Sequence, residues 1–147
     1  MGLFDSLFGG IETTRKLSPQ ESFAGILLAA GACDGHISDE EAENLTTSVG
    51  RMKLFARVNE KEFSQVMDKL LGLLKKKGPE ALMEACAETL PKELVNAAFA
   101  NAVNIVLSDG SVDSDEKEFI ENLRKKLQVE PPVAKAIAQV MVIKNKG

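Results

Sequence analysis

The chain contains the stretch Asp109-Gly110-Ser111-Val112-Asp113-Ser114-Asp115-Glu116, and a related stretch precedes it, Asp34-Gly35-His36-Ile37-Ser38-Asp39-Glu40-Glu41. When the two are aligned, the Asp, the Gly and the last Glu are identical, and Ile37 corresponds to Val112. Each stretch follows a segment without charged residues, 22–33 or 94–108, and precedes a segment whose apolar residues recur at helical spacing. The sequence therefore predicts a unit of apolar helix, acidic turn and amphipathic helix that occurs twice. Packing of the two apolar helices would bring both turns to one end.

Helix starts are marked along the rest of the chain as well. Capping boxes, in which an N-cap side chain and a Glu three residues later bond each other's backbone, are expected at Ser18, Ser38 and Asp113. Asn59 is a further N-cap, and prolines stand at several other predicted starts. No segment alternates like a β-strand. We expect seven main helices with short connections, which form a compact all-α bundle, and the apolar segment 94–107 is expected to be its central helix.

The chain of 147 residues contains no long linker. We therefore expect one helical domain over residues 18–147, preceded by a short amphipathic segment, 1–17. In that segment Leu3, Phe4, Leu7 and Phe8 form a small apolar face. This face could pack on the domain, or contact a partner or the surface of a membrane.

Composition excludes several function classes. The formal net charge is −4, the pI is about 5.1, and there is no Trp or Tyr, which argues against nucleic-acid binding. A single His, with no phosphate-binding Gly loop and no nucleophile–base pair, indicates that the protein is not an enzyme. Cys33 and Cys86 match no metal or redox spacing, so they are predicted to be small buried thiols in a reducing, cytoplasmic compartment. No apolar run reaches the ~18 residues of a membrane-spanning helix.

The acidic turns allow two interpretations. Capping explains most of their residues, because Gly35 and Gly110 would end the preceding helices in a left-handed conformation and acidic side chains favour a first helical turn. Alternatively, the carboxylates form an oxygen-ligand cation site. A standard EF-hand is excluded, because alanine or aliphatic residues stand where its first ligands would be. His36 is either solvated or a ligand of a transition metal.

The motif from Ser108 to Glu116 resembles that of the tellurite-resistance TerB family, and the earlier stretch resembles the first copy in the same family. Phe4-Asp5, near the start of the chain, also resembles this family. The resemblance covers about residues 18–143, although the first copy has Ser38 where the second has Asp113. It implies a bacterial, all-helical protein, related to the N-terminal domain of DjlA-type membrane co-chaperones, with a link to tellurite resistance and stress and no enzymatic activity. It further implies metal-interacting residues, which here correspond to Asp34, Glu41, Asp109, Asp113 and Glu116.

Two functional hypotheses follow. In the first, the protein is a non-enzymatic, stress-associated module whose two acidic turns bind a divalent cation such as Ca²⁺, Mg²⁺, Mn²⁺ or Zn²⁺. In the second, it is a protein-interaction module related to co-chaperone domains, and the acidic turns are purely structural. We expect a protein partner in either case, and the sequence leaves the oligomeric state open.

Overall fold

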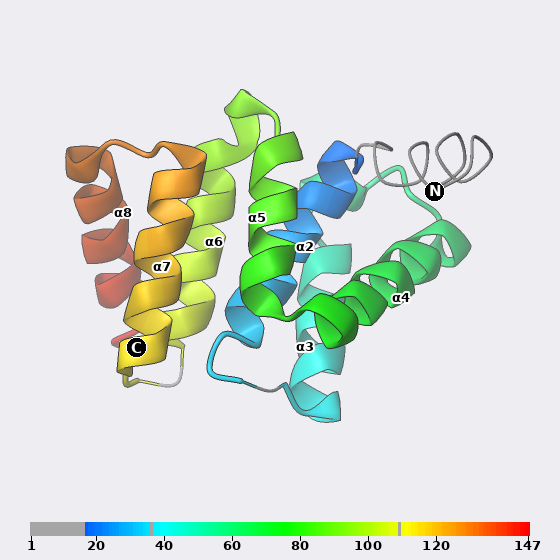
Figure 1. Cartoon of the computed structure of the whole chain (residues 1–147), viewed down its shortest axis with the longest axis horizontal. Coiled ribbons are helices and arrows are strands. Elements are labelled where there is room, and N and C mark those ends of the chain that lie inside the picture. The colour runs from blue at the N-terminus through cyan, green and yellow to red at the C-terminus, as the bar shows by residue number, and fades with distance from the viewer. Residues whose placement is uncertain (1–16, 36, 109) are drawn as a thin grey trace, which may run out of the picture.

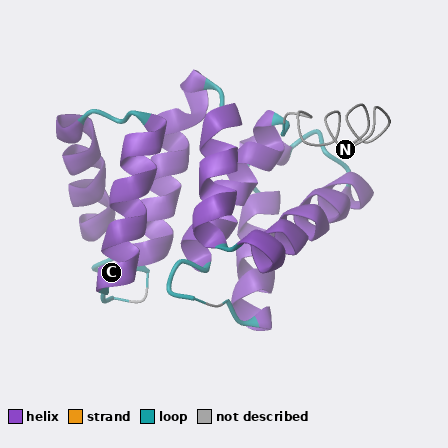
Figure 2. Cartoon of the chain, in the orientation of Figure 1, coloured by secondary structure: helices purple, strands orange, loops and turns teal. Residues whose placement is uncertain are grey.

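The computed structural model describes residues 17–35, 37–108 and 110–147, and in these ranges it contains helices and loops but no strand (Figure 2). The elements are α2 (Pro19–Gly31), α3 (Asp39–Gly50), α4 (Glu60–Lys77), α5 (Pro79–Thr89), α6 (Val95–Leu107), α7 (Ser114–Leu127) and α8 (Pro131–Lys144), with two 3₁₀ turns, η1 (Lys53–Phe55) and η2 (Lys92–Leu94). The prediction of an all-α fold with seven main helices is confirmed for the described residues.

Helix α2 lies at the centre of the molecule. It packs against α3, α4, α5 and α6, and all of its residues from Ser22 to Ala30 are buried (Figure 1). The expectation that 94–107 would be the central helix is therefore wrong. Helix α6 buries one face, which includes Phe99 and Val103, whereas Asn96 and Ala97 are exposed. Its asparagines break the apolar surface, and α6 packs between α2 on one side and α7 and α8 on the other.

Small residues explain why α2 rather than α6 is surrounded. Gly25 leaves room for the Sγ atom of Cys86 in α5, and a Cβ atom at this position would collide with it. Ser22, the one buried polar residue among those described, shares a 2.6 Å hydrogen bond with the Thr89 hydroxyl, also in α5. The close approach of α2 and α5 therefore depends on side chains far apart in the sequence.

The four predicted N-caps are confirmed. At Ser18, Ser38 and Asp113 the side chain accepts a hydrogen bond from the backbone N–H three residues later, at 3.1, 3.1 and 2.8 Å, and the Glu at that position accepts one in return. The Asn59 side chain accepts from the Glu62 N–H at 2.8 Å. These bonds satisfy N–H groups that have no partner inside their helices.

The two turn glycines have positive φ, 116° at Gly35 and 86° at Gly110, as expected. However, α2 ends at Gly31 and α6 ends at Leu107, several residues before these glycines. Gly35 N–H donates to the Ala32 carbonyl at 3.0 Å, so the glycine closes a further turn of chain beyond the helix end. The positive φ reverses the chain toward the next N-cap.

The apolar face expected from Leu3, Phe4, Leu7 and Phe8 lies outside the described residues. None of the helices in the described part of the chain combines the length and the apolar character that crossing a bilayer requires. The last helix, α8, forms one edge of the molecule and packs chiefly on α6 (Figure 1). The Asn145 amide donates to the Asn104 side chain at 2.9 Å and ties the end of α8 to α6.

Candidate functional site

The two acidic turns lie at the same end of the helices (Figure 1). Residues of both turns line one hollow. This acidic hollow has a volume of about 270 Å³. Asp34 and Glu41 line it from the first turn and helix α3, and Glu116 lines it from α7. Its apolar walls include Ile37 and Ile105. Three of the five predicted metal-interacting residues therefore line the same hollow, although they come from both copies of the motif.

Most of these carboxylates already have a structural role. One oxygen of Glu41 accepts from the Ser38 N–H at 3.4 Å, and one oxygen of Glu116 accepts from the Asp113 N–H at 3.1 Å. Asp113 is itself the N-cap of α7. Asp34 precedes the glycine turn and is exposed. The capping interpretation therefore accounts for three of the predicted residues and leaves Asp34 without a structural explanation.

The described residues contain no ready-made metal centre. No three of their His, Cys, Asp and Glu side chains are grouped closely enough to hold an ion. Two of the residues considered from the sequence, His36 and the predicted ligand Asp109, lie outside the described part of the chain. The structure brings Asp34, Glu41 and Glu116 to the acidic hollow without showing a coordination shell.

Cys33 lies beside the acidic hollow and responds to its charge. Burial raises the pKa of this thiol to about 12, and the negative charges of Glu116, Asp34 and Asp113 contribute to the increase. The Cys86 thiol has a pKa of about 12 as well, mainly because it is buried. Both thiols are free and stay protonated at neutral pH, so neither is an activated nucleophile. The prediction of buried thiols holds for Cys86, whereas Cys33 is half-buried.

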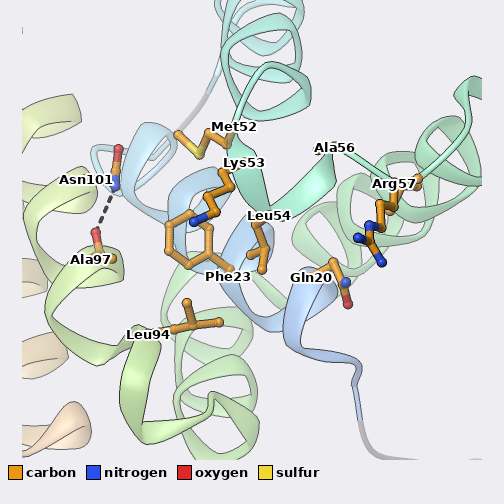
Figure 3. Close-up of a pocket in the computed structure, with 11 residues that line it drawn as sticks. Gln20, Phe23, Met52, Lys53, Leu54, Ala56, Arg57, Leu94, Ala97 and Asn101 are labelled. Atoms are coloured by element: carbon orange, nitrogen blue, oxygen red, sulfur yellow. Dashed lines mark hydrogen bonds between the residues drawn. The ribbon is translucent and has the colours of Figure 1, made fainter.

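A second candidate site was not expected from the sequence. A groove of about 720 Å³, open to solvent, lies between α2, η1 with the residues around it, and the first half of α6 (Figure 3). Phe23, Leu54 and Leu94 line it, as do the exposed Lys53 and Arg57 (Figure 3). We call it the α2–α6 groove. The other residues that line it are Gln20, Met52, Ala56, Val58, Ala97 and Asn101.

The α2–α6 groove has the composition of a recognition surface. Its lining is mainly apolar, and Lys53 and Arg57, the charged residues among the described ones that line it, are both positive and exposed. An apolar group placed there would be shielded from water, and a negative charge beside it would meet two cations. The sequence could not reveal the groove, because its lining comes from three separate segments that only the packing of α2 brings together.

Comparison of the chain with protein-family models, with characterised proteins and with solved structures gave no significant match.

Proposed function

We propose that this chain is a non-enzymatic binding module and that its α2–α6 groove holds an apolar segment of a protein partner with acidic residues beside it. The observation that carries this proposal is the groove itself, which has a mainly apolar lining and two exposed cations. Its volume of about 720 Å³ is enough for several side chains of a partner. The proposal corresponds to the second hypothesis from the sequence, an interaction module whose acidic turns are structural.

A protein segment fits the groove better than an enclosed small molecule. The groove is lined from α2, η1 and α6 and is open to solvent, whereas small-molecule sites bury most of their ligand. Amphipathic helices commonly bind in such grooves through a few apolar side chains, and surrounding charges determine which partner is accepted. Lys53 and Arg57 would select a partner with acidic residues next to its apolar ones.

The test begins with a photo-crosslinking amino acid at Ala97, which is exposed and lines the groove. The matched control places the same group at Thr47, an exposed position of α3 outside the groove. After irradiation in the source cell, we expect a protein linked through position 97 and not through position 47. The crosslinked segment should be apolar with acidic neighbours. A segment without acidic residues, or equal crosslinking at both positions, would contradict the proposal.

A synthetic peptide of the crosslinked segment then provides the quantitative arm. Lys53→Glu with Arg57→Glu should weaken its binding at least about tenfold, since each exchange replaces an attraction by a repulsion. Lys75→Glu with Lys76→Glu is the control, because these exposed lysines at the end of α4 do not line the groove. The proposal of a charge-selective groove would be contradicted if the Lys53→Glu, Arg57→Glu variant bound the peptide as tightly as the unchanged protein, or if both double variants lost affinity equally.

A second candidate function is supported by the acidic hollow. Asp34, Glu41 and Glu116 line this hollow from both turns. A Ca²⁺, Mg²⁺, Mn²⁺ or Zn²⁺ ion could be held there by carboxylate oxygens and by water. This is the function that the resemblance to the TerB family implies, together with a role in tellurite resistance and stress, which stays a proposal here.

Calorimetric titration of the metal-stripped protein with each of the four cations tests this second function, with the melting temperature measured in parallel. An ion that binds only the folded state must raise the melting temperature. Asp34→Asn should abolish both effects, because Asp34 lines the hollow and caps no helix. Asp115→Asn is the control, an exposed acid of the other turn that does not line the hollow. If no cation gave a heat of binding or a shift of the melting temperature, this second function would be contradicted and the turns would serve only to cap helices.

A further inference from the structure

Helix α8 carries all the large apolar side chains that are exposed to solvent in the described part of the chain. They are Val133, Val140, Val142 and Ile143, with exposed fractions of 37, 56, 45 and 67%. The helix packs chiefly on α6 and forms an edge of the molecule (Figure 1). Scattered apolar residues on a surface need no explanation, but their concentration on one edge helix indicates a contact surface.

The exposed residues form a continuous stripe. Val133, Ala136, Val140 and Ile143 are separated by three, four and three positions, and all four are exposed. This spacing places them on one side of an α-helix, as in the contact seam between two packed helices. Val142 is also exposed but lies off this stripe, because it is only two residues from Val140 and one from Ile143. We call the four residues the α8 stripe.

We propose that the α8 stripe binds the α8 stripe of a second copy of this chain, with the two helices antiparallel. About a two-fold axis near Ala138, Val133 then faces Ile143 of the second copy, and the small Ala136 faces Val140. Ile143 thereby meets the smaller Val133, and Val140 meets the small Ala136. The same two contacts occur twice, as a two-fold interface requires. The antiparallel arrangement also places the opposite ends of the two helix dipoles side by side.

Charges at the two ends of α8 fit the same arrangement. Glu130 directly precedes α8 and Lys144 is its last residue, and both are exposed. Neither forms an ion pair with a described residue of its own chain. In the antiparallel pair, Glu130 of each copy approaches Lys144 of the other, which gives two intermolecular ion pairs. A parallel pair would instead bring like charges together at both ends.

The composition of α8 favours this partner over a lipid surface. Helices that lie on membranes usually insert Trp, Phe or Leu, and none of these occurs among residues 131–147. The contact is small, because a helix of 14 residues is only about 21 Å long. We therefore expect a weak dimer, with a dissociation constant on the order of micromolar or higher.

Sedimentation equilibrium of the full chain tests the proposal from low micromolar to near-millimolar concentration. We expect a reversible monomer–dimer equilibrium for the unchanged protein. Val140→Asp should abolish it, because the substituted carboxylate would be buried against Ala136 of the second copy. Val142→Asp is the matched control, since it changes an exposed valine of the same helix outside the α8 stripe, and it should dimerise like the unchanged protein.

The charge pair provides a test that does not depend on burial. Glu130→Lys and Lys144→Glu should each weaken the dimer, and the double exchange should restore it. A chain that stays monomeric throughout, a control that fails like Val140→Asp, or a double exchange without recovery would overturn the proposal. So would a monomer that binds phosphatidylglycerol vesicles through Val140, which would assign the stripe to lipid. The variants touch no residue of the α2–α6 groove, so this proposal and the proposed function can fail separately.

Discussion

Substitution of Gly25 by Ala tests the packing of α2 against α5 most directly. An alanine Cβ at this position would collide with the Sγ atom of Cys86 and would lie 3.3 Å from a methyl carbon of Leu70. Overpacking in a core typically costs about 1–3 kcal/mol, whereas Ala in place of Gly within a helix contributes about 1 kcal/mol in the opposite direction. The difference between these two contributions is a net destabilisation of up to about 2 kcal/mol. Because the neighbour is a buried side chain of another helix, we expect a value in the upper part of this range, about 1–2 kcal/mol.

Thermal and urea denaturation followed by circular dichroism would measure this effect. For a chain of this size the melting temperature should fall by roughly 3–6 °C. Gly72→Ala is the matched control, because Gly72 also lies within a helix but a Cβ there would meet nothing within 4 Å. That control should stabilise the protein by up to about 1 kcal/mol.

The double variant Gly25→Ala with Cys86→Ala shows whether the collision with Cys86 causes the destabilisation. Cys86→Ala removes the sulfur atom, so Gly25→Ala should cost far less in that background, with a coupling of about 1 kcal/mol or more. If Gly25→Ala instead stabilised the protein as Gly72→Ala does, or if the two substitutions were additive, α2 and α5 could not be packed as described.

Three further predictions concern single residues. Burial and nearby carboxylates raise the pKa of Cys33 to about 12. Iodoacetamide at pH 8 should therefore alkylate Cys33 at least about tenfold more slowly than free cysteine. Mass spectrometry of the native protein, with a urea-unfolded control, measures this rate. Burial opposes ionisation of Glu21, but the hydrogen bond from Lys69, at 2.8 Å, and the Ser18 backbone outweigh it and lower the pKa of Glu21. The stabilisation is therefore present above the ordinary pKa of 4.5 and is lost as the pH falls through the lower folded value, so the melting temperatures of the unchanged protein and Glu21→Gln should converge in acid. Gly35→Ala should lower the unfolding free energy by about 1–2 kcal/mol, because φ of +116° disfavours any Cβ although space is free around it; equal stability in urea would show that the turn adjusts.

The helix starts could be predicted from the sequence because capping is local. The Ser18 and Asp113 boxes need only residues three positions apart, and both form as expected. The position of α2 at the centre could not be predicted, because it depends on Gly25 meeting Cys86, a contact between residues distant in the chain. Apolar content alone favoured 94–107, since hydrophobicity does not show which helix has neighbours on every side.

The two candidate sites also differ in how far the sequence predicts them. The convergence of Asp34 and Glu116 on one hollow follows from the repeated motif once the apolar helices α2 and α6 pack together. Whether those carboxylates bind a cation depends on the positions of individual oxygens, which the motif does not determine. The α2–α6 groove has no sequence signature, because Phe23 and Leu54 look like ordinary core residues in their own segments.

The central position of α2 also has a consequence for how the molecule opens. Its buried residues contact most of the other helices, so the amide hydrogens of α2 cannot reach solvent unless the whole bundle separates. Helix α8, which packs chiefly on α6, can detach while that centre stays intact. Amide exchange should then divide the chain into a slow centre, whose rate reports global unfolding, and a faster edge that opens locally. Association of two copies through α8 would slow exchange at this edge and leave the exchange of α2 governed by global unfolding.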